Sequence, residues 1–471
     1  MRFTSTALGV FSLLGFSLPS VYAANATFFP LMNMTDSAGD LIQAHGGCII
    51  QAGNGGGDWY WFGTDRTGQA ADAHFEAVNC YKSADFSTWD FVGPVLTPIP
   101  NTNISNSSVL QRPKVLYNDK NSEYVMWWHA DNADYSEAAV GVATSKTIDG
   151  KYEWKGNFQP FGNQSRDMTV WKDPDTQVAY LIYATNNNAD LSIARLTDDY
   201  LNVSKTLYTF HGVYEEAPGV FKIDGKFYLV ESPQNGWTPT NNAYYVASSM
   251  SGPWSKSTLL APDTAYTYLT QNTYDIVING TSQQFYLYLG DHWNGNQLAT
   301  SSYAFYPVIH KGNSLSIHYT GGWTLDAATG VWTDLPYELI TAKMSTTSRK
   351  TLVACGDGCA GGKAANMTSS TNFSFTWNGS AGAKVLQIVY TYPGPNNDFQ
   401  QIGVTVDGKA APGNALMEST LGTSFGQMAP FPVTLKKGSK VVLNLLDYDG
   451  TAFLVDAVRV YDSPTAAPPG Y

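Results

Sequence analysis

Charged residues are scarce in this sequence. Of its 471 residues, 27 are Lys or Arg and 39 are Asp or Glu, so charged side chains make up 14% and the net charge is −12. No run of Lys and Arg occurs along the chain. Because binding to nucleic-acid phosphates depends on clustered positive charge, we predict that nucleic acid is not a partner.

Long apolar segments are missing after the N-terminus. There, Arg2 precedes the apolar run "ALGVFSLLGFSL", and Val21-Tyr22-Ala23 fits the small-residue rule for signal cleavage. The run is too short to span a bilayer. We therefore predict a signal peptide over residues 1–23, a secreted extracellular protein and no membrane span.

Acceptor sites for N-linked sugars agree with secretion. The Asn-X-Ser/Thr sites are Asn25, Asn33, Asn103, Asn106, Asn163, Asn202, Asn279, Asn366, Asn372 and Asn378. Cysteine is rare, with four in the chain, and an oxidising compartment favours disulfides. Cys355 and Cys359 are close enough for a local bridge, and Cys48 would then pair with Cys80. Neither spacing, with no histidine nearby, resembles a zinc site, so we predict structural cysteines.

Aromatic residues make up 14% of the chain, the same share as charged residues. Aromatic faces and uncharged hydrogen-bonding groups are how proteins hold neutral sugars, but a β-rich core has the same composition. Composition alone leaves both interpretations open.

Helical periodicity is absent from every long segment. Instead, five short aromatic strands recur, each ending in small, polar or charged residues. They are "DWYWFGTD" from Asp58, "EYVMWWHAD" from Glu123, "VAYLIYATNN" from Val178, "KFYLVESPQ" from Lys226 and "FYLYLGDHW" from Phe285. Most are followed by a second strand and a turn. This repetition predicts an all-β fold with a five-bladed β-propeller, and two stacked sandwiches would explain the regular spacing less well.

Polar residues at the strand ends of a propeller share one central pocket. At the ends of the apolar runs they are Asp65, His129, Asp131, Asn187, Asn188, Glu231 and Asp291, and at strand entrances they are His45, Gln111, Asp167, Glu216 and Gln271. Each alone could be an ordinary buried polar group, and only their convergence favours a function. An acid beside an aromatic wall has a raised pKa, which suits the proton donor that glycosidic hydrolysis requires.

One stretch combines these signals. "EEAPGVFKIDGKFYLVES", from Glu215, places a Pro-Gly break after two acids and Asp224-Gly225 between two strands. Asp-Gly favours a tight hairpin, and the break places a carboxylate at a strand entrance.

Several motifs together resemble the fungal exo-β-1,3-galactanases of glycoside hydrolase family 43. They are "RPKVLYNDKNSEYVMWWHAD", "VGVATSKTIDGKY", "SRDMTVW", "EEAPGVFKIDGKFYLVES" and "TQNTYD", within about residues 43–332. The resemblance implies a five-bladed propeller that removes galactose, with inversion, from the β-1,3-galactan of plant arabinogalactan.

The resemblance also assigns roles to residues. It implies that Glu216 is the general acid, that Asp167 positions substrate and tunes that acid, and that Glu215 is a solvated neighbour. The wider family has a basic Asp near the first blade's entrance, where this chain reads "IQAHGGCII" with no acid. In the galactanases a glutamine lies opposite the acid, corresponding to Gln271, which acts as its imidic acid tautomer or holds the water. In an inverting enzyme this pair should be separated by roughly 6.5–9.5 Å.

Gln111 departs from the galactanase pattern. It precedes Arg112 where those enzymes have a glutamate that contacts the substrate and the attacking water, and Gln234 replaces a threonine. Losing a charge-assisted hydrogen bond costs roughly 1.5–3 kcal/mol, or one to two decades of rate. The substrate-binding residues that the resemblance implies are Gln111, Arg112, Tyr135, Asn187, Gln234 and Trp237.

The C-terminal part has a different composition and no five-blade rhythm. Strand-like runs such as "KVLQIVYTY" and "FLVDAVRVY" predict a β-sandwich, which resembles a family 35 carbohydrate-binding module. Such modules hold calcium, here between Glu338 and Asp456, but Ile340 occupies the second Glu position and argues against the metal. We predict no cofactor, and a sandwich that only stabilises the protein is an alternative.

The predicted organisation is a signal peptide (1–23), a propeller hydrolase domain (24–333), a β-sandwich module (334–464) and a tail (465–471). We predict a monomeric galactanase that acts on plant cell-wall polysaccharide. A catalytically weakened lectin-like protein, or an arabinofuranosidase or β-xylosidase, stays an alternative because a fold does not fix a function.

Overall fold

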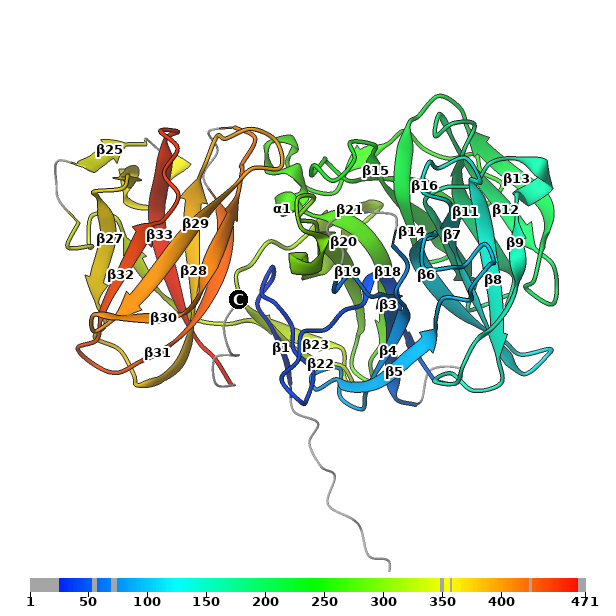
Figure 1. Ribbon diagram of the computed structural model, residues 1–471, viewed down its shortest axis with the longest axis horizontal. Coiled ribbons are helices and arrows are strands. Elements are labelled where there is room, and N and C mark those ends of the chain that lie inside the picture. The colour runs from blue at the N-terminus through cyan, green and yellow to red at the C-terminus, as the bar shows by residue number, and fades with distance from the viewer. Residues whose placement is uncertain are drawn as a thin grey trace, which may run out of the picture.

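The structure is a computed structural model and describes residues 25–52, 57–68, 74–347, 351–355, 358–422 and 426–464. The predicted signal peptide and tail lie outside these residues. Within them, the fold is all-β, with a five-bladed propeller followed by a sandwich, which confirms the predicted class (Figure 1). No helix in the described ranges is long and apolar enough to cross a membrane.

Each blade is a four-stranded antiparallel sheet in simple sequence order. Blade one comprises β2 (His45–Gln51), β3 (Trp59–Thr64), β4 (Val78–Ser83) and β5 (Asp90–Leu96); blade two comprises β6 (Val109–Asn118), β7 (Glu123–Asp131), β8 (Ala139–Ser145) and β9 (Glu153–Phe158). Blade three comprises β10 (Met168–Lys172), β11 (Ala179–Thr185), β12 (Asp190–Leu196) and β13 (Val203–Phe210); blade four comprises β14 (Glu215–Ile223), β15 (Lys226–Pro233), β16 (Ala243–Ala247) and β17 (Thr258–Leu259). Blade five comprises β18 (Gln271–Asn279), β19 (Gln284–His292), β20 (Ser302–Lys311) and β21 (Ser314–Ile317).

The first strands of the blades contact one another in the order β2, β6, β10, β14, β18 and back to β2, which closes the ring. The five aromatic runs of the sequence are the second strands. Because first and second strands are antiparallel, the end of each second strand lies beside the entrance of the first. Gln111 is thus opposite His129, and Gln271 is opposite Asp291. The predicted hairpin at Asp224-Gly225 also forms, with φ of 50° and 73° at its two turn residues.

A small sheet completes the propeller. It consists of β1 (Ala26–Phe28), β22 (Trp323–Asp326) and β23 (Val331–Asp334). Phe28 stacks on Trp323 at 4.5 Å, and both pack into one apolar cluster with residues of blades one and five. The segment before the first blade and the segment after the last blade are therefore held together at the junction between those blades.

Short turns connect these strands. They are the 3₁₀ turns η1 (Pro160–Gly162), η2 (Asp263–Ala265), η3 (Leu298–Thr300) and η6 (Ala360–Gly362), and α1 (Tyr266–Leu269). All four residues of α1 have positive φ, from 48° to 62°, so α1 is a left-handed turn. Tyr268 stacks on Tyr319 with ring centroids 3.8 Å apart, and the Thr267 hydroxyl accepts a hydrogen bond from the backbone N–H of Asn242. The turn leads into β18, which begins at Gln271.

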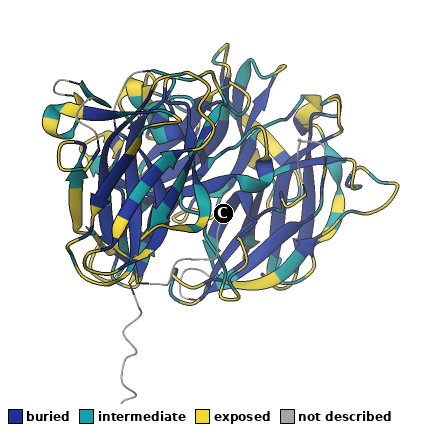
Figure 2. Ribbon diagram, turned by 60° about the vertical axis from the view of Figure 1, so that its left-hand side comes forward, coloured by how far each residue is buried: buried dark blue, intermediate teal, exposed yellow. Residues whose placement is uncertain are grey.

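The C-terminal part consists of two sheets. One comprises β24 (Tyr337–Thr341), β25 (Leu352–Ala354), β26 (Lys363–Met367), β28 (Gly382–Thr391), β31 (Gln427–Leu435) and β33 (Phe453–Asp462); the other comprises β27 (Asn372–Thr376), β29 (Phe399–Val406), β30 (Lys409–Glu418) and β32 (Lys440–Leu445). Their facing sides form a single apolar core. Figure 2 shows that buried residues follow the strands of both parts while exposed residues gather in the connections.

The two parts of the molecule touch through specific contacts. His292 Nε2 lies 2.7 Å from Glu418 Oε2, and the ring of Phe29 packs edge-on against Tyr461 at 5.8 Å. The Tyr319 hydroxyl donates to the carbonyl of Gly426 at 2.7 Å. The sandwich is therefore packed against the propeller rather than tethered to it by a linker alone (Figure 1).

Of the two predicted disulfides, only Cys355–Cys359 forms. Cys48 and Cys80 are buried free thiols, so their predicted pairing is wrong. Both cysteines pair with Phe62 of β3, the strand that lies between β2 and β4. They are thus two strands apart, about 9–10 Å, which is too far for a disulfide.

The two carboxylates that the resemblance matches to a calcium site, Glu338 and Asp456, lie apart. Glu338 pairs with Val460, whereas Asp456 lies beside Ala342 at the other end of the same strand pair. This places the two carboxylates about 13 Å apart along the strands. Asp456 Oδ2 instead accepts a hydrogen bond from the backbone N–H of Ala360 at 3.0 Å. Among the described residues, no group of three His, Cys, Asp or Glu side chains could hold a metal ion.

Candidate active site

The entrances of the first strands surround a cavity of 220 Å³ to which all five blades contribute. Its lining residues are Gly46, Arg66, Gln111, Arg112, His129, Tyr135, Arg166, Asp167, Asn188, Glu216, Gly236, Trp237, Gln271 and Trp293. The convergence of strand ends that the repeats predicted therefore occurs.

β-Bulges aim side chains into this cavity. The pairing of the first and second strands shifts between Gln111 and Lys114 in blade two, and between Glu216 and Gly219 in blade four. Bulges bend a strand locally and re-aim its side chains. Gly219 is required for close packing, because a Cβ there would lie 2.2 Å from an Asp275 carboxylate oxygen. The Pro-Gly break thus brings blade four close enough to blade five for Glu216 to meet Gln271.

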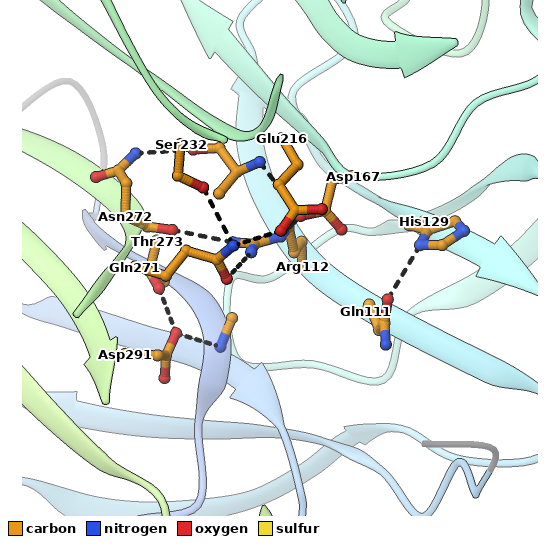
Figure 3. A network of polar contacts seen from close by, with 12 residues as sticks. Gln111, Arg112, His129, Asp167, Glu216, Ser232, Gln271, Asn272, Thr273 and Asp291 are labelled. Atoms are coloured by element: carbon orange, nitrogen blue, oxygen red, sulfur yellow. Dashed lines mark hydrogen bonds and ion pairs between the residues drawn. The ribbon is translucent and has the colours of Figure 1, made fainter. Parts of the chain in front are cut away.

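Glu216 is in direct contact with Gln271. Gln271 Nε2 donates to Glu216 Oε1 at 2.8 Å (Figure 3). Burial is the main cause that raises the pKa of Glu216 to about 8, and the negative charge of Asp167 adds to it, while Arg112 and Gln271 oppose it. The carboxyl group of Glu216 is therefore protonated at neutral pH, the state that a proton donor needs.

Arg112 organises the other groups around Glu216. Its Nε donates to Asp167 Oδ2 at 2.6 Å and its Nη2 to Gln271 Oε1 at 2.7 Å. Trp293 Nε1 also donates to Gln271 Oε1, at 3.0 Å. Two donors at this oxygen fix the orientation of the amide, so its nitrogen faces Glu216. Asp167 Oδ2 also accepts from the backbone N–H of Ala217 at 3.2 Å.

The contact between Glu216 and Gln271 contradicts the separation that we expected. At 2.8 Å the two side chains leave no room for a water molecule between them, whereas an inverting pair would be roughly 6.5–9.5 Å apart. The separation expected of an inverting pair is therefore not found, and the water-holding role given to Gln271 stays a prediction. Gln271 is placed to orient the acid.

Gln111 lies on the other side of Arg112 from the Glu216–Gln271 pair (Figure 3). Its Oε1 is 3.1 Å from Nδ1 of His129, and Nε2 of His129 is 3.0 Å from Asp131 Oδ2. Burial opposes ionisation of Asp131, but the hydrogen bond from His129 and backbone N–H groups outweighs it and lowers the pKa. Asp131, His129 and Gln111 thus form a row of polar contacts that ends in the cavity.

Tyr135 and Arg166 adjoin this row. Gln111 Nε2 donates to the Tyr135 hydroxyl at 3.4 Å, and Arg166 Nη2 donates to the Tyr135 carbonyl at 3.0 Å. On the far wall, the rings of Trp237 and Trp293 meet edge-to-face at 4.9 Å. Aromatic surface and hydrogen-bonding groups thus share one cavity, as sugar binding requires.

Two predicted binding residues lie outside the lining. Asn187 is exposed and its backbone N–H donates to Gln164 Oε1, while its neighbour Asn188 lines the cavity. Gln234 uses its Nε2 to donate to the carbonyls of Asn188 at 2.6 Å and Glu215 at 3.3 Å. Gln234 therefore holds the backbone of Asn188 from outside the cavity lining. The roles assigned to Asn187 and Gln234 stay predictions.

Glu215 is not the solvated neighbour that we expected. It is buried, and its Oε1 accepts a hydrogen bond from the Tyr245 hydroxyl at 2.7 Å. Burial raises the pKa of Glu215 to about 7, and burial together with the charge of Glu215 raises the pKa of Glu231. Strand alternation explains the difference, since consecutive residues face opposite sides of a sheet.

Other predicted polar residues support the cavity wall. Asp291 Oδ2 accepts from the backbone N–H of Gly46 at 3.0 Å, and its Oδ1 lies 3.1 Å from Nδ1 of His45. Lys114 donates to the Gly46 carbonyl at 2.6 Å, and burial lowers the pKa of Lys114 to about 7. Gly46 is therefore fixed from both sides. Asp65 Oδ2 similarly accepts from Asn79 at 3.0 Å.

Sequence reasoning missed Gly46, Arg66, Arg166, Gly236 and Trp293 as lining residues. Trp293 could have been found, because it closes the fifth aromatic run and ends a strand like the other candidates. Arg66 follows Asp65 and Arg166 precedes Asp167. Neither arginine stands in a sequence pattern of its own that would have predicted it.

The family model described as "Glycosyl hydrolases family 43" matches residues 53–299, which include most of this cavity. The chain belongs to glycosyl hydrolase family 43. A search of curated proteins finds no match.

Solved structures of this family are similar to the whole chain. A family 43 exo-β-1,3-galactanase from Phanerochaete chrysosporium, solved with β-1,3-galactotriose and separately with galactose, is 32% identical. The match covers 92% of this chain and 100% of that chain, with a TM-score of 0.85. An exo-β-1,3-galactanase from Clostridium thermocellum is 24% identical over 94% of this chain and 98% of that one, with a TM-score of 0.62, and supports the fold.

Proposed function

We propose that this family 43 member is a secreted hydrolase that releases galactose from the β-1,3-galactan backbone of arabinogalactan, with inversion. The observation that carries the proposal is Glu216, an acid with a pKa of about 8 in a cavity that also holds tryptophan rings and amides. Similarity to a galactanase solved with galactose and with β-1,3-galactotriose supports the choice of sugar.

In this proposal Glu216 donates its proton to the glycosidic oxygen as the bond breaks. Gln271 holds the carboxyl group from one side, and Arg112 holds Gln271. Asp167 is ion-paired with Arg112 at 2.6 Å, and its negative charge helps to keep Glu216 protonated. The aromatic walls exclude water from the leaving group, which strengthens each of these electrostatic interactions.

The attacking water must lie on the opposite face of the sugar from the acid. Gln271 contacts the acid directly, so we assign the water to the side of Gln111. Its carboxamide has one oxygen acceptor and is backed by His129 and Asp131. An amide orients water but is a poor base, so we expect slower turnover than a glutamate would give.

A binding function without catalysis is the second candidate. Among the described residues that line the cavity, only Asp167 and Glu216 carry carboxyl groups, and Asp167 is already paired with Arg112. The side where an inverting enzyme needs a base is occupied by neutral Gln111. This arrangement suits a protein that holds a galactan end and cleaves it slowly or not at all.

Product analysis tests the proposal. The purified protein is incubated with β-1,3-galactan, and with arabinan and xylan as alternatives, and the released sugars are separated and identified. We expect galactose only, and NMR during the first turnovers should show the inverted anomer. Release of arabinose or xylose would overturn the proposed substrate. Tight binding of galactan oligosaccharides with no product would favour the binding function.

A further inference from the structure

A second cavity lies between the propeller and the sandwich. Its volume is 470 Å³, against 220 Å³ for the active-site cavity, and ligand sites have volumes of roughly 300–1,000 Å³. Propeller residues lining it include His292, Asn294 and Asn296, and sandwich residues include Phe399, Gln401 and Asn414. The cavity exists only because the two parts pack together.

The sandwich wall is built by strand alternation. Ile402 and Val404 of β29 point into the sandwich core, so Phe399 and Gln401 point out of it. On the adjacent strand β30, Asn414 lies on the same outer face, and its Nδ2 donates to Gln401 Oε1 at 2.9 Å. An aromatic ring therefore stands beside a pair of linked carboxamides, and all three side chains line the cavity.

The propeller wall is shared with the active site. Trp293 lines the active-site cavity, and Gly295 packs against Trp237, so close that a Cβ would lie 2.7 Å from the tryptophan Cβ. The alternate residues, His292, Asn294 and Asn296, line the second cavity. One short segment thus forms the wall between both cavities.

The chemistry of the lining selects the ligand. Lys and Arg do not occur among the described residues that line the cavity, which excludes a site for phosphate or another anion. Its polar groups are mainly carboxamides and hydroxyls, which both donate and accept hydrogen bonds as sugar hydroxyls do, together with the Asp398 carboxylate, which accepts them. Phe399 and the His292 ring, 6.4 Å apart, supply flat surfaces for the apolar face of a sugar ring.

We propose that this interdomain cavity is a second saccharide site that binds a neutral hexose unit, separate from the catalytic cavity. Two sources could supply the hexose. One is a free oligosaccharide of the polysaccharide substrate. The other is a glycan of the protein itself, because Asn33, an acceptor in Asn-Met-Thr, also lines the cavity.

Binding is measured calorimetrically with β-1,3-galactotriose and the full-length Glu216→Gln protein, which prevents hydrolysis and keeps the test independent of the proposed activity. The test variant adds Gln401→Ala and Asn414→Ala. The matched control adds Asn444→Ala, an amide on the neighbouring strand β32 that does not line the cavity. We expect the test variant to lose one binding site or bind it at least tenfold more weakly, and the control to bind as its parent does.

Two preparations distinguish the sources. Protein from a bacterial host lacks N-linked sugar, and protein from a fungal secretory host can carry it on Asn33. Triose binding in the cavity of both preparations identifies the oligosaccharide. Binding only to the bacterial protein, restored in the fungal protein by Asn33→Gln, identifies the glycan. Binding that is the same in the parent and the test variant, with saccharide density in a soaked crystal confined to other sites, overturns the proposal.

Discussion

Six carboxyl groups are buried among the described residues of the propeller. They are Asp131, Asp173, Glu215, Glu231, Asp275 and Asp291. The sandwich buries two among its described residues, Glu418 and Asp456, and the first of these pairs with His292 of the propeller.

The propeller therefore buries more ionisable groups than the sandwich, whose interior is a single apolar core. Burying a carboxyl group costs free energy unless it is paired or protonated. Near the strand entrances of the propeller, burial raises the pKa of Glu215, which lies beside the cavity, and of Glu216, which lines it. Such clusters are typical of active sites. Among its described residues the sandwich buries fewer carboxyl groups than the propeller, so we expect it to contribute binding and stability.

The largest expected effect comes from removing the proton donor. Glu216→Gln should reduce galactose release by about 10³-fold, because a general acid contributes roughly 10²–10⁴-fold. The measurement is initial rate on β-1,3-galactan. Glu215→Gln is the matched control, since that carboxyl group is buried against Tyr245 outside the cavity, and it should retain activity within a few-fold. Equal losses in both variants would show that burial, not position in the cavity, decides the effect.

Removing the amide that holds the acid should have the next largest effect. Gln271→Ala eliminates the 2.8 Å contact to Glu216 and the partner of Arg112, and we expect about a 10²-fold loss of kcat. Ser232→Ala, which removes a weaker 3.2 Å acceptor of the same amide, should lose less than tenfold. An unchanged kcat in Gln271→Ala would contradict the role of Gln271 in orienting the acid.

Adding a charge at the water side should raise the rate. Gln111→Glu places a carboxylate next to His129. In the wild-type protein, the amide oxygen of Gln111 lies 3.1 Å from Nδ1 of His129. We expect about a 10- to 100-fold increase on β-1,3-galactan, from the roughly 1.5–3 kcal/mol of a charged hydrogen bond. The anomer of the product is read by NMR. A retained anomer would contradict inversion, and no rate with binding preserved would favour a lectin-like protein.

The pH dependence should follow Glu216. Because its pKa is raised to about 8, kcat/KM should fall about tenfold for each pH unit above 8. The same shift affects stability. An acid with a folded pKa above its unfolded value stabilises the fold fully below about pH 4 and loses that contribution as pH rises to 8. Glu216→Gln should therefore raise Tm relative to wild type at pH 8 and leave it unchanged at pH 4. A descending limb near pH 5 would contradict this assignment.

Removing the sandwich should have the smallest effect on chemistry. A chain that ends at Asp334 keeps all lining residues of the active-site cavity, and we expect rates on β-1,3-galactobiose within about threefold of wild type. Degradation of polymer should slow more, because the sandwich and the interdomain cavity are lost. Thermal melts check that the shortened protein is folded. Equal losses of rate on short and long substrates would contradict the assignment of catalysis to the propeller and of polymer binding to the sandwich.

Much of this architecture could be predicted from the sequence. The five aromatic runs and the Asp224-Gly225 turn predicted the blades. The positions at strand ends predicted that one cavity would hold Gln111, Asp167, Glu216 and Gln271. These features are local, because pleating and turn chemistry depend on neighbouring residues. The whole fold class followed from them.

Apart from the burial of Glu215, the errors concern contacts between strands. Whether Cys48 reaches Cys80 depends on which strand lies between them, and whether Gln271 touches Glu216 depends on the bulge at Gly219. Register and bulges are set by tertiary packing, so sequence patterns suggested partners without fixing their distances.

The left-handed turn α1 has a consequence for engineering this protein. Left-handed backbone costs non-glycine residues roughly 1–2 kcal/mol each, and Tyr266, Thr267, Tyr268 and Leu269 all adopt it, with only Thr270 between them and Gln271. A thermostabilisation programme would place glycine at these positions first. The stacked ring of Tyr268 and the hydroxyl of Thr267 would be lost with each such change, and the glutamine that follows would move more freely. Selection for heat resistance and selection for turnover should therefore choose different residues in this turn.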